Sequence, residues 1–234
     1  MTENQLVDNI ARIKDNIEQA AVLCGRNPKE ISLMAVTKTV APEWVNAAIA
    51  NGVTLLGENK AQELCSKYDS YNRDNVDIHF IGHLQTNKVK QIAEKVSTIQ
   101  SVDSIKLAKE ISTQAIALGK VMKVLVEVNI AGEQSKSGVS PDRLTDFLYE
   151  LSQVPSIAVE GLMTIPPADV SLLETENFFN NIYSQFLDIQ RQKIDNVNMY
   201  TLSMGMSNDY KEAIKHGSTM IRMGTLLFGA RNYI

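Results

Sequence analysis

Apolar positions along the chain follow two alternating patterns, one helical and one extended. A helix is predicted near the start, where apolar residues recur at steps of three and four: Leu6, Ile10, Ile13, Ile17 and Ala20. This spacing places the side chains on one face of an amphipathic helix. Gly25 and Pro28 predict its end. Residues 31–36 are then mostly apolar, and we expect a short buried strand there.

The same helix–strand couplet repeats to the end of the chain. The predicted strands cover residues 31–36, 53–56, 77–81, 97–101, 121–130, 157–164, 199–203 and 219–223. The predicted helices between them cover residues 42–50 and 59–67, a segment from 86, residues 104–118, segments from 141 and from 171, and residues 209–215. Near-continuous apolar strands that alternate with helices are typical of a parallel sheet with both faces covered.

Eight such strands in 234 residues favour a closed (β/α)₈ barrel, which typically takes about 250 residues. A doubly wound open sheet is the alternative, because periodicity does not reveal closure. Residues 225–234 are too few for a full outer helix, and the extra N-terminal helix is expected to cover that gap. We therefore predict an α/β fold, a single (β/α)₈ barrel of the TIM type with an extra N-terminal helix, in which residues 1–234 form one domain.

Composition and charge exclude several classes of protein. The chain has 23 Lys and Arg against 27 Asp and Glu, a formal charge of −4. It therefore lacks the excess of basic residues that is typical of proteins that bind nucleic acid or an acidic membrane surface. Cys24 and Cys65 cannot build a disulfide framework, and with three histidines they form no zinc pattern. The chain shows no signal peptide and no apolar run of about 20 residues. We expect a cytoplasmic protein.

Candidate chemistry is sought at the carboxyl ends of the strands, where barrel enzymes place their active sites. Lys38 follows the first strand directly. A lysine at the inner end of a buried strand is partly desolvated, which lowers its pKa and makes its amine nucleophilic toward carbonyl groups. The alternative is an ordinary lysine that reaches solvent from the start of a loop.

The ends of the seventh and eighth predicted strands have the composition of an anion site. Gly205, Ser207, Gly224 and Thr225 supply small residues, hydroxyl groups and close backbone approach, and barrel phosphate sites are frequently built from these two loops. The alternative is that they only form tight turns and a helix cap. The sequence contains no GxGxxG or Walker motif, so nucleotide binding has no support.

Other polar features are weaker indicators. His83 follows the third strand and is either a general acid or a structural hydrogen-bonding group. The polar segment 132–138 contains Lys136 and is either a mobile lid or a plain surface loop. The methionines at strand ends more often pack a core, and no Ser–His–Asp arrangement or GxSxG elbow is present.

Taken together, the strand ends resemble a known family. The motifs are Val36-Thr37-Lys38, Gly57-Glu58-Asn59, FIGHLQTNK at 80–88, GLM at 161–163, GMSND at 205–209 and RMGT at 222–225. This set is similar to the pyridoxal phosphate homeostasis proteins from about residue 31 to residue 233. The resemblance implies a single (β/α)₈ barrel, like the N-terminal domain of alanine racemase and of the eukaryotic ornithine decarboxylases.

The resemblance also implies a role for each matching residue. Lys38 would form a Schiff base with pyridoxal 5′-phosphate (PLP), and Asn59 would lie near the ring face or its phenolic oxygen. Arg222 would lie against the pyridine nitrogen. The residues that would hold the phosphate are Met206, Ser207, Gly224 and Thr225.

The implied function is binding, storage and supply of PLP without catalytic turnover. A guanidinium beside the pyridine nitrogen disfavours the ring protonation on which PLP relies as an electron sink, and we expect no second domain after residue 234 to supply a further base. The alternatives are a minimal PLP-dependent amino-acid racemase or lyase, and a barrel enzyme that acts on a phosphorylated metabolite without a cofactor. PLP-dependent apo-enzymes are the expected partners, and the chain is expected to be a monomer or a weak dimer.

Overall fold

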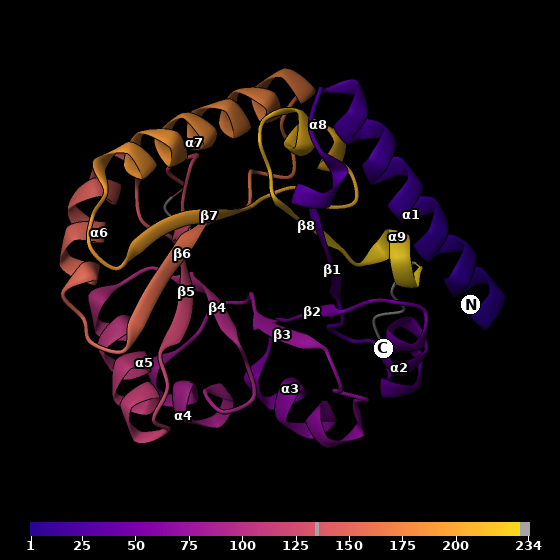
Figure 1. Cartoon of the computed structure of the whole chain (residues 1–234), viewed down its shortest axis with the longest axis horizontal. Helices are drawn as coiled ribbons and strands as arrows, with labels where there is room; N and C mark the ends of the chain where they lie inside the picture. Colours follow the sequence, from indigo (N-terminus) through magenta and orange to yellow (C-terminus); the bar gives the residue numbers. More distant parts are fainter. Residues whose placement is uncertain (134–135, 230–234) are drawn as a thin grey trace.

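The computed structural model describes residues 1–133 and 136–229, and its strands form one closed barrel (Figure 1). All eight strands are parallel to their neighbours, and β8 returns to pair with β1, so the predicted closed barrel is confirmed and the open sheet is wrong. The strands are β1 (Ser32–Val36), β2 (Leu55–Glu58), β3 (Asp77–Phe80), β4 (Thr98–Val102), β5 (Met122–Val128), β6 (Ile157–Thr164), β7 (Val197–Ser203) and β8 (Met220–Met223).

Helices surround the barrel (Figure 1). In the described part of the chain the α-helices are α1 (Glu3–Leu23), α2 (Pro42–Ala50), α3 (Ala61–Lys67), α4 (Val89–Ile92), α5 (Ile105–Ala117), α6 (Leu144–Ser152), α7 (Leu172–Gln192), α8 (Tyr210–Lys215) and α9 (Thr225–Phe228). Short 3₁₀ turns are η1 (Pro28–Glu30), η2 (Tyr68–Ser70), η3 (Thr86–Lys88) and η4 (Pro141–Arg143).

Helix α1 fills the gap that the short last helix leaves in the outer ring, as predicted. It begins at a capping box, in which the Thr2 hydroxyl accepts from the Gln5 backbone N–H and the Gln5 side chain accepts from the Thr2 N–H. Its predicted apolar face is buried. This face contacts α2, α8 and α9 (Figure 1), and α9 has only 4 residues. The N-terminal helix therefore takes the place of an eighth outer helix.

Several predicted boundaries shift by one or two residues. Strand β2 starts at Leu55 and extends through Glu58, because it pairs with β3 from Leu55 opposite Asp77 to Glu58 opposite Phe80. Gly57 and Glu58 thus lie within the strand, whereas the sequence prediction placed them after it. Strand β5 ends at Val128, short of the predicted residue 130, because the chain turns there: Gly132 N donates to Asn129 O.

Apolar packing occurs both outside and inside the barrel. A large cluster lies between the strands and the surrounding helices, while a small separate one comprises Met34, Val36, Leu55, Ile81 and Met220. Buried polar side chains accompany this small cluster, since Gln100 on β4 contacts the Met220 sulfur on β8 at 3.1 Å. Side chains from non-adjacent strands of a closed barrel meet only in its interior, so the interior is partly polar.

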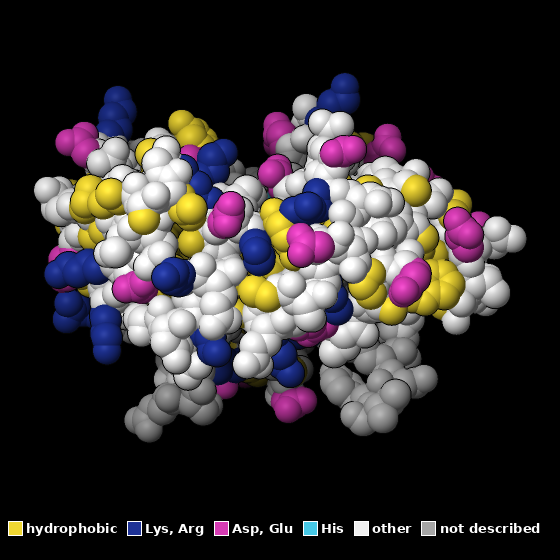
Figure 2. Space-filling model, turned by 90° about the horizontal axis from the view of Figure 1, so that it is seen from below, with side chains coloured by type: hydrophobic (Ala, Val, Ile, Leu, Met, Phe, Trp, Pro, Cys, Tyr) yellow, Lys and Arg dark blue, Asp and Glu magenta, His cyan; other side chains and the backbone are white. Residues whose placement is uncertain are grey.

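The surface carries mixed charge. Figure 2 shows basic and acidic side chains interspersed over the face in view, without a continuous stripe of one sign. Among the helices of residues 1–133 and 136–229, none combines the length and the hydrophobicity needed to cross a bilayer.

Candidate functional site

A cavity of about 590 Å³ opens at the carboxyl ends of the strands. It brings together every residue to which the resemblance gives a role, from four different strand ends: Lys38, Asn59, Met206, Ser207, Arg222, Gly224 and Thr225. The predicted nucleophile and the predicted anion loops therefore share one cavity. Lys38 lines this cavity, in agreement with its interpretation as an inward-facing lysine.

The backbone on both sides of Lys38 is firmly held. On the preceding side, Thr37 N donates to Gly57 O at 3.0 Å, which joins β1 to β2. On the following side, Thr39 has φ of 61°, a left-handed conformation that is unusual for a β-branched residue. The Thr39 N–H donates to the Glu63 carboxylate. Such local strain persists only where neighbouring contacts fix it, so the direction of residue 38 is set by its neighbours.

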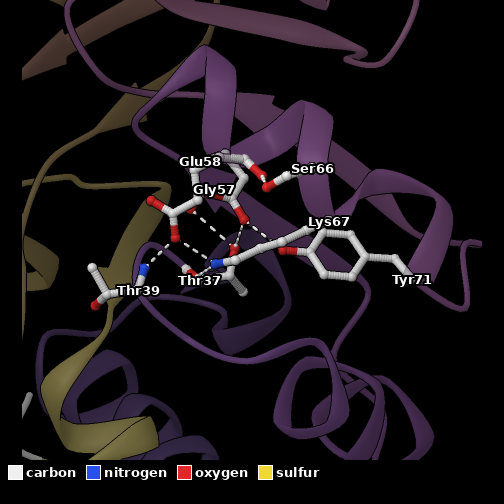
Figure 3. Close-up of polar contacts among 8 residues, drawn as sticks. Thr37, Thr39, Gly57, Glu58, Ser66, Lys67 and Tyr71 are labelled. Carbon is white, nitrogen blue, oxygen red and sulfur yellow. Dashed lines mark hydrogen bonds and ion pairs between the residues drawn. The ribbon is translucent and has the colours of Figure 1, made fainter.

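A compact polar cluster stands behind this segment (Figure 3). The Lys67 ammonium donates to Thr37 O at 3.2 Å and forms an ion pair with Glu63, the residue that also binds Thr39 N. Glu63 and Lys67 lie one turn apart on α3. This single helix therefore contacts the chain immediately before and immediately after Lys38.

Glu58 belongs to the same cluster and, like Thr37, has no exposed surface. Its Oε1 accepts from the Thr37 hydroxyl at 2.6 Å and from the Tyr71 hydroxyl at 2.7 Å (Figure 3). Within the described residues, its Oε2 has no hydrogen-bond partner. Burial raises the pKa of the Glu58 carboxyl, because removal from water disfavours the charged form.

Replacing Tyr71 with Phe removes one of the two donors to Glu58. We expect the free energy of unfolding to fall by about 1–2 kcal/mol, the usual cost of leaving a buried acceptor without its partner. Urea unfolding measures the change, with Tyr149→Phe as the control because Tyr149 is half exposed. Equal stability of the two variants would show that the Tyr71 hydroxyl does not support the cluster.

Arg222 is held rigidly beneath the cavity. It is 3% exposed, its Nη1 donates to Ser203 Oγ at 2.8 Å, and its Nη2 donates to Thr164 O at 2.9 Å. Burial lowers the pKa of the guanidinium to about 10, so it stays charged at neutral pH. These bonds use two of its five N–H donors and leave the others available to a group in the cavity.

The charge of Arg222 influences the pKa values of two carboxyl groups, those of Glu127 and Asp209. Burial raises the pKa of Glu127 to about 7, helped by the negative charge of Asp103 and opposed by Arg222. Burial also raises the pKa of Asp209, while its hydrogen bond from Met206 N and the charge of Arg222 act in the opposite direction. The surroundings of Arg222 thus contain two acids whose pKa values are raised by burial.

The raised pKa of Glu127 makes stability depend on pH. An ordinary carboxyl has a pKa of 4.5 and this one about 7, so the folded state binds the proton more tightly and loses stability as pH rises from about 4.5 to 7. Glu127→Gln removes that loss. We expect the variant to exceed the wild type in unfolding free energy by up to about 3 kcal/mol at pH 8, and to match it at pH 4.

Urea unfolding at pH 4 and pH 8 checks this expectation. Glu150→Gln makes the same chemical change on an exposed helix position and serves as the control. A Glu127→Gln protein that shows the same difference from the wild type at both pH values would contradict the raised pKa.

The two anion loops are built by tight backbone geometry. Gly205 has φ of 93°, and a Cβ there would lie 2.5 Å from the Ala213 Cβ, so only glycine fits. The following turn closes when Asp209 Oδ1 accepts from Met206 N at 2.5 Å. Gly224 and Thr225 lie where β8 passes into α9, and the first amide groups of a helix have no partner within it. The first amide groups of α9 and the hydroxyls of Ser207 and Thr225 therefore lie near the cavity.

The sequence analysis missed one wall of the cavity. This wall is the segment after β6 with the start of α7: Ile165, Pro166, Pro167, Ala168, Val170, Leu172 and Thr175. The Pro166-Pro167 pair directly after the strand could have indicated an extended loop at the barrel mouth. Asn208 and Asp209 also line the cavity, and they belong to the motif that was recognised there.

The weaker candidates from the sequence, His83 and the segment 132–138, make hydrogen bonds within the protein. His83 Nδ1 lies 3.1 Å from Ser137 Oγ, and the Asn129 side chain donates to Glu133 O and Lys136 O. Residues 134–135 of the suggested lid lie outside the described residues. The methionines at 163, 204 and 223 are buried in the core, as expected, whereas Met206 is 37% exposed and lines the cavity.

The chemistry of the cavity fits an aldehyde that carries an aromatic ring and an anionic tail. The Lys38 amine lines the cavity together with the small residues, hydroxyls and backbone of the loops after β7 and β8. In the part of the chain that the structure describes, Asn59 Oδ1 is buried and lacks a hydrogen-bond partner, so it offers an acceptor that a ligand can satisfy. No cluster of three metal-ligating residues occurs among the described residues.

Comparison with known proteins agrees with this geometry. The family model for the alanine racemase N-terminal domain matches residues 9–232. This chain is 38% identical to the pyridoxal phosphate homeostasis protein of Aquifex aeolicus, over 97% of this chain and 98% of that protein. It is 35% identical to the protein of the same name from Escherichia coli, over 98% of each.

Solved structures extend the comparison. The PipY protein of Synechococcus elongatus with PLP bound has 30% identity and a TM-score of 0.84, over 96% of this chain and all of that one. An alanine racemase from Clostridium difficile has 20% identity and a TM-score of 0.77, over 98% of this chain and 60% of that one, and shares the fold. The chain therefore belongs to the alanine racemase N-terminal domain family and, within it, to the pyridoxal phosphate homeostasis proteins.

Proposed function

We propose that this protein binds PLP and serves in PLP homeostasis, holding and supplying the cofactor without catalytic turnover. The observation that carries the proposal is the single cavity lined by Lys38 and by both anion loops. Its relatives are named for PLP homeostasis, and PipY was solved with PLP bound. We propose further that residues 1–234 act as one PLP-binding unit in the cytoplasm.

Lys38 holds PLP as a Schiff base in this proposal. The clamp of Glu63 and Lys67 on the neighbouring backbone keeps its side chain directed to the cavity. The phosphate is bound by Met206 and Ser207 on one loop and by Gly224 and Thr225 on the other. Asn59, with its unpartnered Oδ1, lies beside the ring or its phenolic oxygen.

Arg222 favours binding over turnover. A bound PLP delocalises a substrate carbanion most strongly when its ring nitrogen is protonated. A guanidinium fixed by Ser203 and Thr164 places a permanent positive charge beneath the cavity, and a positive charge beside that nitrogen lowers its affinity for a proton. The site therefore retains the cofactor without activating it strongly.

PLP-dependent apo-enzymes are the proposed recipients of the cofactor. The mouth of the cavity has an apolar rim of Ile165, Leu172, Met206 and Leu226, which are between 37% and 60% exposed. Apolar surface beside a ligand site suits transient contact with a partner. We propose that the protein itself is a monomer or a weak dimer.

A titration with PLP tests the function. The purified protein is expected to gain a near-ultraviolet to visible absorption band with a stoichiometry of one PLP per chain, and the band is expected to change on borohydride reduction. Exchange of the Cα hydrogen of a panel of amino acids should be no faster than with free PLP. A protein that stays colourless with PLP contradicts the proposed binding, and rapid exchange contradicts the absence of turnover.

A further inference from the structure

A continuous line of buried polar side chains runs from Arg222 through the interior of the barrel. Arg222 Nη1 donates to Ser203 Oγ at 2.8 Å, and Ser203 Oγ donates to Gln100 Oε1 at 2.8 Å. Gln100 Nε2 in turn lies 2.8 Å from His79 Nδ1. All four side chains are at most 9% exposed. Strands β8, β7, β4 and β3 contribute one member each.

The direction of every hydrogen bond in this line follows from Arg222. A guanidinium has only donors, so the Ser203 oxygen must accept from it, and the single Ser203 proton is then free for Gln100. The Gln100 carbonyl oxygen receives that proton, which turns its NH₂ group toward His79. Nδ1 of His79 must therefore accept, and its ring proton must be on Nε2.

His79 has the protonation state that this arrangement needs. Burial lowers the pKa of His79 to about 4, with a smaller lowering by Lys123 and an opposing effect of Asp77. The imidazole is thus neutral at physiological pH, and its Nδ1 is available as an acceptor. His79 also borders a second cavity, of about 320 Å³, together with Asp77 and Lys123.

A buried row of polar side chains lowers the stability of the folded state unless each polar group has a hydrogen-bond partner. An apolar cluster lies in the same interior, and apolar side chains would pack there without directional requirements. The far end of Arg222 is fixed separately, because Nη2 donates to Thr164 O while the Thr164 hydroxyl donates to Val128 O at 2.8 Å. With Nη2 bound to Thr164 O, the hydrogen bond to Ser203 Oγ therefore sets the orientation of the guanidinium plane.

We infer that Gln100 is a positioning residue for Arg222, which it orients through Ser203, and that this chain of hydrogen bonds (the relay) holds His79 as the Nε2–H tautomer. The inference rests on the proposed function, in which Arg222 faces the ring nitrogen of PLP. Gln100 itself does not line the cavity that holds the site.

The first experiment examines the protein without PLP. Nitrogen-15 NMR of the histidine side chains, with His79 assigned by His79→Asn, reports which ring nitrogen carries the proton. We expect the Nε2–H tautomer in the wild type. A protonated Nδ1 would reverse the relay and overturn the inference, whether or not the protein binds PLP.

The second experiment compares Gln100→Leu with Gln19→Leu, the same change at an exposed position of α1. Loss of the Gln100 carbonyl is expected to raise the dissociation constant of PLP about tenfold, the effect of a lost buried hydrogen bond to a charged network. The pH midpoint of the bound chromophore should rise, because a less firmly held positive charge opposes protonation less.

Gln100→Glu distinguishes positioning from simple packing. Its carboxyl group still accepts from Ser203, so PLP affinity is expected to stay within a few-fold of the wild type. The NMR signal of His79 should change because Nδ1 loses its amide partner: a carboxylate requires Nδ1 to donate, and a carboxylic acid replaces the amide N–H with an O–H. Unaltered affinity and midpoint in Gln100→Leu overturn the inference. If Gln100→Leu does not fold, a Gln100→Glu protein with an unchanged His79 NMR signal overturns it. A wild type that binds no PLP instead refutes the proposed function and leaves the NMR result to decide the relay.

Discussion

A Lys38→Ala protein is expected to form no borohydride-stable adduct with PLP. The side chain of Lys38 is the amine that lines the cavity with both anion loops, and alanine cannot condense with an aldehyde. The phosphate contacts remain, so weak non-covalent binding should persist. Mass spectrometry of the intact protein after reduction measures the adduct, and absorbance measures the lost chromophore.

The control is Lys60→Ala, which removes an exposed lysine just after β2 at the same end of the barrel. Its adduct and chromophore should equal those of the wild type. An undiminished adduct in Lys38→Ala would place the condensation on another lysine and refute the assigned role. Loss of the adduct in both variants would show that the effect is not specific to Lys38.

The Arg222→Met protein is expected to lose about 3–5 kcal/mol of unfolding free energy at pH 8, as when one partner of a buried ionic group is removed. Ser203 Oγ and Thr164 O lose their donor, and the charge that opposes the raised pKa values of Glu127 and Asp209 disappears. At pH 5 Glu127 is already protonated, so the loss should be smaller. Urea unfolding at the two pH values measures both quantities.

Arg222→Lys provides the matched comparison. Lysine keeps the positive charge but cannot reproduce the two directed bonds of the guanidinium, so we expect an intermediate stability and a weaker dependence on pH. A pH-independent loss in Arg222→Met would show that packing dominates over charge at this position. Full stability of Arg222→Lys would show that the directed bonds contribute little.

The fold could be predicted because each outer element has a clear local pattern. The apolar face of α1 from Leu6 to Ala20 is the one that the structure buries. Closure of the barrel depends on β8 pairing with β1, from Ser32 opposite Met220 to Ala35 opposite Met223, and no periodicity in the sequence reports such a contact. The count of strands and the shortage of residues for a last helix were the only indications.

The site could be predicted only as far as its residues stand at strand ends. Lys38 and Thr225 were singled out by that position and by the resemblance, and Arg222 by the resemblance alone. Gln100 and His79 were not found, because each lies in mid-strand, where facing the barrel interior depends on pairing register. Glu127 was missed for the same reason, since its raised pKa comes from burial and from Asp103 on another strand's loop.

A crystal structure of the protein grown with PLP is the most direct test of the central claim. We expect continuous electron density from Lys38 Nζ to the cofactor, with the phosphate between the loop at 206–207 and the loop at 224–225. A structure in which the Lys38 amine points to bulk water and both loops carry no phosphate would contradict it.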